Sequence, residues 1–225
     1  FSFYNKLPKH FKDSLKDGNI DIPSLIRFIL QEEGLSFGQL PKGLIPFHLY
    51  GNFIINPFQE HILQGTKIAG EKAEFHFTIN RNYMDQINQS IKTLHEITGI
   101  DYSYSFSNQE NESRSIAFTE NNIPAKNIDN DIILRPSGHG ALVKNLNKID
   151  ADIIFIKNID NIQHFDKAEV ALRTKKALAG LLIQFQTDVF DLIESIDSND
   201  VNWTKKLNQI KFVHLLVYKL HLHYI

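Results

Sequence analysis

Residues 73–106 read AEFHFTINRNYMDQINQSIKTLHEITGIDYSYSF, and this stretch decides the predicted fold. Residues 73–79 predict a strand, residues 81–98 a helix that Gly99 stops, and residues 102–106 a second strand. A change from strand to helix and back to strand is typical of βαβ units, in which the strands run parallel. The segment therefore predicts an α/β fold.

The same alternation extends to both sides of this segment. Upstream, residues 44–49 predict a strand, and residues 56–70 a helix that Asn56 and Pro57 open and Gly70 ends. Downstream, strand candidates lie at 115–118, 132–134 and 153–156, and the last of these has the continuous apolar character of a buried parallel strand. The sequence therefore predicts a mostly parallel, Rossmann-like sheet flanked by helices.

The pattern divides the chain into three regions. Residues 1–40 predict a helical lobe, residues 41–165 the α/β core, and residues 166–225 only helix, in two pieces. Residue 1 is Phe and the last apolar stretch stops without a cap, so we expect a fragment of a longer protein. The alternative is a processed domain whose last helix packs on its own core.

Composition excludes several classes of protein. The 225 residues carry 24 Lys and Arg against 26 Asp and Glu, a net charge of -2, which disfavours general nucleic-acid binding. No apolar run reaches the roughly 20 residues of a membrane-spanning helix. Cysteine is absent, which excludes thiolate catalysis and cysteine-ligated zinc. No signal-peptide pattern is visible, so we expect a cytoplasmic protein with no membrane partner.

The first candidate for ligand chemistry is a lysine held in a constrained turn. Lys42 lies between Pro41 and Gly43, immediately before a predicted strand. Pro fixes φ and Gly permits close approach, so the ammonium group could meet a phosphate there. An exposed loop lysine beside a Pro-rich turn is the alternative.

The second candidate is the loop Gly138-His139-Gly140, which follows a predicted strand and opens a predicted helix. Two glycines around one residue let backbone N–H groups face a base edge or a phosphate at the positive end of the helix, and His139 could hydrogen-bond. A plain strand-to-helix turn capped by Ser137 explains the pattern equally well.

The third candidate follows the predicted strand 153–156, where Asn158, Asp160 and Asn161 stand at its carboxyl end. Ligands of open α/β sheets bind at the carboxyl ends of strands, and an Asp there can hold Mg²⁺ that bridges to a phosphate. A turn rich in Asn and Asp after an edge strand is the alternative.

Taken in order along the chain, these segments resemble those of a known enzyme family. Pro41-Lys42-Gly43, a turn with Gln109, Gly138-His139-Gly140 and Asn158-Ile159-Asp160-Asn161 are similar to motifs of UDP-sugar pyrophosphorylases, uridylyltransferases of the nucleotide-diphospho-sugar transferase superfamily. Over nearly its whole length the chain is similar to a bacterial family known only as a domain of unknown function.

The resemblance implies a GT-A or nucleotidyltransferase-like fold and a Mg²⁺-dependent reaction. A sugar 1-phosphate and a nucleoside triphosphate, with UTP favoured, would give a nucleotide-sugar and pyrophosphate. Lys42 and Asp160 would be catalytic, with Asp160 also on the metal. The nucleotide or sugar would contact Gly43, Gln109, Gly138, His139, Gly140, Asn158 and Asn161. The alternative is a non-catalytic nucleotide-sugar-binding or interaction module.

Overall fold

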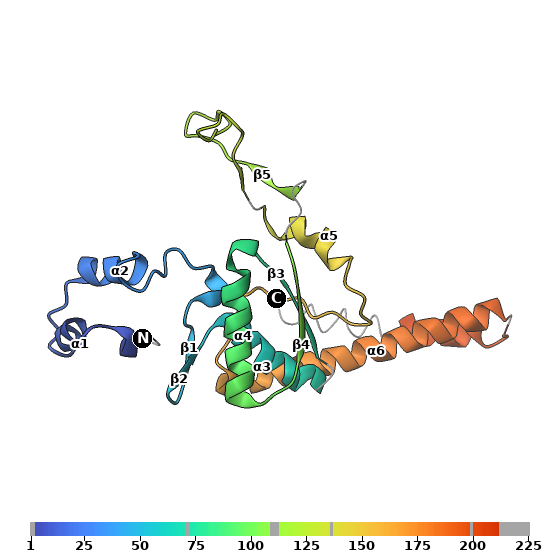
Figure 1. Ribbon diagram of the computed structural model, residues 1–225. Coiled ribbons are helices and arrows are strands. Elements are labelled where there is room, and N and C mark those ends of the chain that lie inside the picture. Colours follow the sequence, from blue (N-terminus) through green and yellow to red (C-terminus); the bar gives the residue numbers. More distant parts are fainter. Residues whose placement is uncertain (1–2, 71–72, 109–112, 136, 199, 212–225) are drawn as a thin grey trace. The chain divides into compact units, whose positions relative to one another are not determined.

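The structure is a computed structural model that describes residues 3–70, 73–108, 113–135, 137–198 and 200–211 (Figure 1). Contacts within the chain divide it into two units, Phe1–Ala168 and Glu169–Ile225. The candidate site lies in the first unit.

The first unit begins with short helices that have a small core of their own. They are η1 (Tyr4–Lys6), α1 (Lys9–Lys16) and α2 (Ile22–Leu30). Asp21 caps α2, because its side chain accepts a hydrogen bond from the Ser24 backbone N–H. Buried Leu7, Phe11 and Leu25 form the centre of this core.

A β-hairpin occupies the place where the sequence predicts the strand 44–49. Lys42–Leu44 form a 3-10 turn, η2, and the strands β1 (His48–Tyr50) and β2 (Phe53–Ile55) pair antiparallel. Gly51 in the connecting turn has φ +56°, a conformation that glycine adopts without strain. The Gly51-Asn52 pair between two apolar runs is the sequence signal for this hairpin, and it turns the chain back before any crossover helix.

Helix α3 (Pro57–Ala69) has the ends that the sequence predicts. The Asn56 side chain accepts from the Gln59 backbone N–H at 3.1 Å, and the Gln59 side chain accepts from the Asn56 backbone N–H at 2.9 Å. This reciprocal capping box satisfies two of the backbone donors that a helix start leaves without partners.

The stretch 73–106 forms the predicted strand, helix and strand. Strand β3 (Glu74–Thr78) is followed by η4 (Arg81–Tyr83) and α4 (Met84–Thr98), and β4 (Ser103–Ser107) pairs parallel with β3, with Glu74 opposite Ser103 (Figure 1). One face of the pair packs with α3 and α4 on a buried core of Phe58, Ile62, Ile79, Ile87, Ile91 and Leu94.

The prediction of a mostly parallel, Rossmann-like sheet of the GT-A or nucleotidyltransferase-like type is wrong, both upstream of β3 and beyond β4. Strands β5 (Ser115–Ile116) and β6 (Leu134–Arg135) pair antiparallel, and bridges join Phe118 to Pro124 and Lys126 to Ile132. The strand candidates 115–118 and 132–134 are thus the two arms of one hairpin. The described residues form three separate two-stranded sheets, of which only β3 with β4 is parallel.

The predicted buried strand 153–156 is also absent from the structure. These residues have no regular secondary structure, and the exposed fractions of Ile154, Phe155 and Ile156 are 39%, 46% and 74%. An apolar run becomes a strand only when another strand offers it an edge and a second layer covers it. Apolar character alone therefore misled the prediction here.

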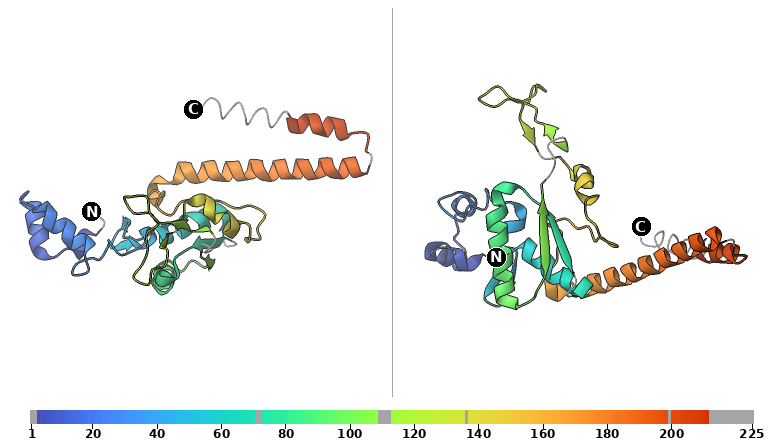
Figure 2. Two further views of the ribbon diagram at one scale, coloured as in Figure 1. Left: turned by 90° about the horizontal axis from the view of Figure 1, so that it is seen from above. Right: turned by 45° about the vertical axis from the view of Figure 1, so that its right-hand side comes forward.

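The second unit begins with α6 (Glu169–Asp197), and residues 203–211 form a second helix that runs back along it (Figure 2). The Lys206 ammonium joins them by hydrogen bonds to the Ser195 hydroxyl and to the Asp191 carbonyl oxygen, the latter at 3.5 Å. Among the described helices, none is long and apolar enough to cross a membrane.

Candidate functional site

The structure brings together the two residues proposed to be catalytic, Lys42 and Asp160, which lie 118 positions apart in the chain. The Lys42 Nζ atom is 2.8 Å from Asp160 Oδ2, the distance of a charge-assisted hydrogen bond. The exposed fractions of the two side chains are 74% and 46%. An exposed ion pair contributes at most about 1 kcal/mol to stability, so the pair adds little to the fold.

Gly43 has a packing role in the turn that carries Lys42. Gly43 is buried, and a Cβ atom built on it would lie 2.4 Å from the Phe58 ring. The close approach that a glycine permits here is therefore to the first turn of α3. This contact packs the Lys42 turn against the hydrophobic core.

The segment 157–164, which carries Asp160, has no helix or strand of its own but is anchored at several points. Ile159 and Asp160 lie in a turn, and the Asn161 backbone N–H donates to the Asn158 carbonyl at 3.3 Å. From α3, His61 Nε2 donates to the Ile159 carbonyl at 3.1 Å, one residue before Asp160.

Further anchors follow Asp160. Gln64 Nε2 donates to the Gln163 carbonyl at 2.7 Å, and the Phe165 backbone N–H donates to the Tyr50 hydroxyl at 2.6 Å. The His164 ring stacks on the Tyr50 ring with centroids 4.0 Å apart. The segment thus bridges β1 and α3, and ends in the short turn η7 (Phe165–Lys167).

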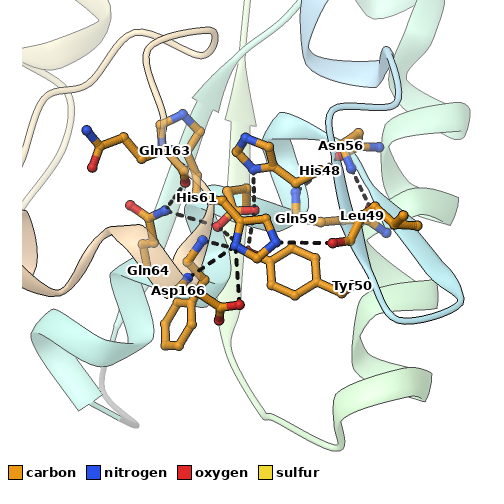
Figure 3. A network of polar contacts seen from close by, with 12 residues as sticks. His48, Leu49, Tyr50, Asn56, Gln59, His61, Gln64, Gln163 and Asp166 are labelled. Carbon is orange, nitrogen blue, oxygen red and sulfur yellow. Dashed lines mark hydrogen bonds and ion pairs between the residues drawn. The ribbon is translucent and has the colours of Figure 1, made fainter. Parts of the chain in front are cut away.

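Figure 3 shows several of these anchoring side chains, among them Tyr50, His61 and Gln64, and a buried carboxylate, that of Glu60, belongs to the same network. Glu60 is fully buried, and its oxygens contact the Tyr50 hydroxyl at 2.9 Å, His48 Nδ1 at 2.8 Å and Gln64 Nε2 at 3.0 Å. Burial raises the pKa of the Tyr50 hydroxyl far above its ordinary value, and the neighbouring Glu60 adds to this. Tyr50 therefore stays protonated and donates to Glu60.

Sequence reasoning did not identify Glu60, Tyr50 or Gln64 as members of a site. Tyr50 lies 10 residues before Glu60 in the chain and belongs to the hairpin β1–β2. The sequence predicts one strand of a βαβ unit in this region. The Gly51-Asn52 turn signal would have placed β1 next to the start of α3. No local signal marks Glu60 as buried, because its burial depends on packing between β1, α3 and the segment 157–164.

The loop Gly138-His139-Gly140 opens a helix that is shorter than predicted. His139–Leu142 form a 3-10 turn, η6, and Val143–Leu146 a single α turn, α5. The Ser137 hydroxyl contacts the Ser115 hydroxyl at 2.5 Å and does not cap the helix. The helix dipole at Gly138 is correspondingly weak. Gln109 and the side chain of His139 lie outside the residues that the structure describes.

Asn145 connects this loop to the carboxyl end of β4. Its buried amide Nδ2 donates to the Ser107 hydroxyl at 2.9 Å and to the Asn108 carbonyl at 2.8 Å. The helix after the glycine loop is thereby tied to the strand end that leads to Gln109. Among the described residues, no donor contacts the buried side-chain oxygens of Asn108 and Asn145, so each can accept from an added donor.

The candidate metal residue, Asp160, fits one mode of magnesium binding. The described part of the chain contains no cluster of three or more His, Asp or Glu side chains that could hold a metal ion. Mg²⁺ is commonly bound by one or two carboxylates together with substrate phosphates and water. Asp160 could supply such a single carboxylate, so the ion would be held jointly with a nucleotide.

Comparison with known proteins supports membership of a family without supporting a particular activity. No curated protein and no solved structure matches the sequence significantly. The resemblance to UDP-sugar pyrophosphorylases therefore rests on the motifs alone. A family described as "Domain of unknown function (DUF4301)" matches residues 1–223, and the chain belongs to this family.

Proposed function

We propose that Lys42 and Asp160 bind the phosphates of a nucleoside triphosphate, and that the protein transfers its nucleotidyl group to a sugar 1-phosphate. The observation that supports this proposal is the exposed ion pair between the two side chains at 2.8 Å. It joins two segments whose motifs resemble those of the pyrophosphorylases. UTP is the favoured nucleotide because the motifs resemble those of uridylyltransferases.

The exposure of the pair suits it to ligand exchange. A phosphate oxygen could replace Asp160 as the partner of the Lys42 ammonium at little cost, because both side chains are already partly solvated. The Asp160 carboxylate could then contact a cation that arrives with the nucleotide. The two residues would thus hold opposite charges of one ligand.

The proposed reaction forms one phosphorus–oxygen bond and breaks another. A phosphate oxygen of the sugar 1-phosphate would attack the α-phosphorus in line, and the bond to the β-phosphate oxygen would break to release pyrophosphate. Lys42 would stabilise the charge that develops on the phosphate oxygens. Magnesium, when bound with the nucleotide, would supply further neutralisation of that charge.

The hydrogen bonds of Asn145 support a location for the base or sugar of the ligand. They tie the helix after the Gly138–Gly140 loop to Ser107 at the end of β4 and to Asn108. We propose that Gly138, His139, Gly140 and Gln109 contact the base or sugar, and that Asn158 and Asn161 contact the ligand beside Asp160.

The test is pyrophosphate release by the full-length protein with Mg²⁺, UTP and several sugar 1-phosphates. Asp160→Asn should lower turnover about 100-fold or more, because it keeps the side-chain shape but removes the charge that matters in the transition state. Lys42→Met should have a comparable effect. Lys126→Met is the matched control, because it removes an exposed lysine whose ammonium group donates to the Asn130 side chain at 3.0 Å, and it should leave turnover unchanged.

Calorimetry separates the outcomes. Binding of UDP-sugar or UTP without turnover would favour the non-catalytic binding module. Equal binding of UTP by wild type and both site variants would remove Lys42 and Asp160 from the site. A wild-type protein that neither binds nor turns over these compounds would overturn the proposal.

A further inference from the structure

We propose that Glu60 is the positioning residue of the Lys42–Asp160 site, since its buried carboxylate orients the side chains that anchor the segment 157–165. The inference rests on the proposed function for its consequence in ligand binding. Its structural content, that Glu60 and Tyr50 hold Asp160 beside Lys42 before any ligand arrives, is separate from that function and can be tested without a ligand.

The first link runs through the amide of Gln64. One of its amide hydrogens goes to Glu60 Oε1 at 3.0 Å and the other to the Gln163 carbonyl at 2.7 Å, while its oxygen faces Lys157 Nζ at 3.4 Å. The opposite orientation of the amide would set its oxygen against two acceptors and its hydrogens against an ammonium group. Glu60 therefore selects the single orientation that anchors the segment on both sides of Asp160.

The second link runs through the Tyr50 hydroxyl. The hydroxyl donates its one hydrogen to Glu60, and this leaves its lone pairs free to accept the Phe165 backbone N–H at 2.6 Å. Because Glu60 accepts the hydrogen, Tyr50 is oriented as an acceptor toward the segment. The buried carboxylate thus acts on Phe165 through Tyr50.

A third anchor, from His61 to the Ile159 carbonyl, comes from the residue that follows Glu60 on α3. The anchored groups belong to residues 157, 159, 163 and 165, so they lie on both sides of position 160. Since residues 157–164 have no helix or strand of their own, these contacts hold Asp160 in place together with Ile159, which packs on the core, and buried Ile162. A network that served only the core would not need to bind this segment at four places.

Tyr50→Phe is the variant that tests this arrangement, because it keeps the ring and removes only the hydroxyl. Tyr102→Phe is its matched control: the Tyr102 hydroxyl is also half-buried and also donates one hydrogen bond, to the Ile91 carbonyl at 2.6 Å, away from the segment. We expect hydrogen exchange of the Phe165 amide and its neighbours in 157–165 to be about tenfold faster in Tyr50→Phe and unchanged in Tyr102→Phe.

A second measurement follows Lys42 directly. Reductive methylation of the Lys42 amine, measured by mass spectrometry relative to Lys126, should be about threefold faster in Tyr50→Phe, because a displaced Asp160 no longer pairs with it. A merely structural loss of stability would raise exchange throughout the first unit and would leave this ratio unchanged. Unchanged exchange in 157–165, or an unchanged methylation ratio, would overturn the proposed positioning.

The binding experiment uses UTP with Mg²⁺ and the full-length protein. Tyr50→Phe should weaken binding about threefold to tenfold, and Tyr102→Phe should not change it. If binding is unchanged while exchange in 157–165 rises, Glu60 does not position the ligand site, and this inference fails while the proposed function stands. If wild type does not bind UTP, the proposed function fails, and the exchange and methylation results still decide whether Glu60 and Tyr50 hold Asp160.

Discussion

Two carboxylates in the first unit, Glu60 and Asp160, show opposite ways to use the same functional group. Glu60 is fully buried and contacts three side chains, Tyr50, His48 and Gln64. Asp160 is about half exposed and pairs with an exposed lysine. A buried charge must be fully partnered or it destabilises the fold, whereas an exposed charge is free to exchange its partner. The first arrangement suits a fixed framework, and the second suits binding.

The largest expected effect on stability is at the buried carboxylate. Glu60→Ala should lower the free energy of unfolding by about 3–5 kcal/mol, because it leaves buried donors of Tyr50 and Gln64 without an acceptor and opens a cavity. Urea unfolding measures the change. Glu96→Ala, an exposed glutamate on α4, is the control and should stay within about 0.5 kcal/mol of wild type. A small loss in Glu60→Ala would mean that the network adds little to the framework.

A smaller effect is expected where the framework meets the site. Gly43→Ala should destabilise by about 1–3 kcal/mol, because the added Cβ would overlap the Phe58 ring and force the Lys42 turn to shift. Gly138→Ala provides the matched control, since nothing lies within 4 Å of its Cβ position and its φ of -68° suits any residue. Equal stability of the two variants would show that the turn is not packed on α3.

Strand β3 carries a histidine, His76, whose protonation should make the stability of the fold depend on pH. Burial lowers the pKa of His76 below 6.5, so the folded state holds the ring neutral while the unfolded state takes up a proton more readily. The contribution of the neutral His76 ring to the free energy of unfolding is therefore fully present above about pH 6.5 and is lost as the pH falls below that value. His76→Gln should show a weaker fall in urea midpoint between pH 7.5 and 5.5 than wild type. An identical pH dependence in both proteins would contradict the shift.

The smallest expected effect on stability is at the exposed carboxylate. Asp160→Asn should change the free energy of unfolding by less than about 1 kcal/mol, because an exposed ion pair contributes little. Thermal unfolding of the variant, run beside the turnover assay, measures this. A loss comparable with that of Glu60→Ala would show that Asp160 belongs to the framework, and the contrast between the two carboxylates would disappear.

Local signals explain which parts of the fold were predictable from the sequence. The start of α3 depends on Asn56 and Gln59, and its end depends on Gly70. Each residue acts within one turn of its own end of the helix, and both ends were predicted correctly. The stretch 73–106 was predictable for the same reason, since its periodicity changes clearly between strands and helix. The segment 153–156 was not, because its state depends on whether another strand offers it an edge.

The residues of the candidate site also differ in whether a local sequence signal marks them. Lys42 and Asp160 are candidates from the sequence because their turns have recognisable motifs, whereas their contact across 118 residues has no local signal. Glu60 and Asn145 were missed, because what distinguishes them is burial among side chains from distant segments. A motif shows which residue types are present, whereas burial is known only once the packing is known.

The alternation along β4 has a consequence for how the chain folds. Tyr104 and Phe106 point to the core, and Ser103, Ser105 and Ser107 to the other face, where His76 contacts two of these serines at 2.8 Å. A slip of one residue against β3 would turn all three serines into the apolar layer and both rings out of it. Misregistered pairing of these strands is therefore less stable than the native register, because it would bury the serine hydroxyls and expose the two rings.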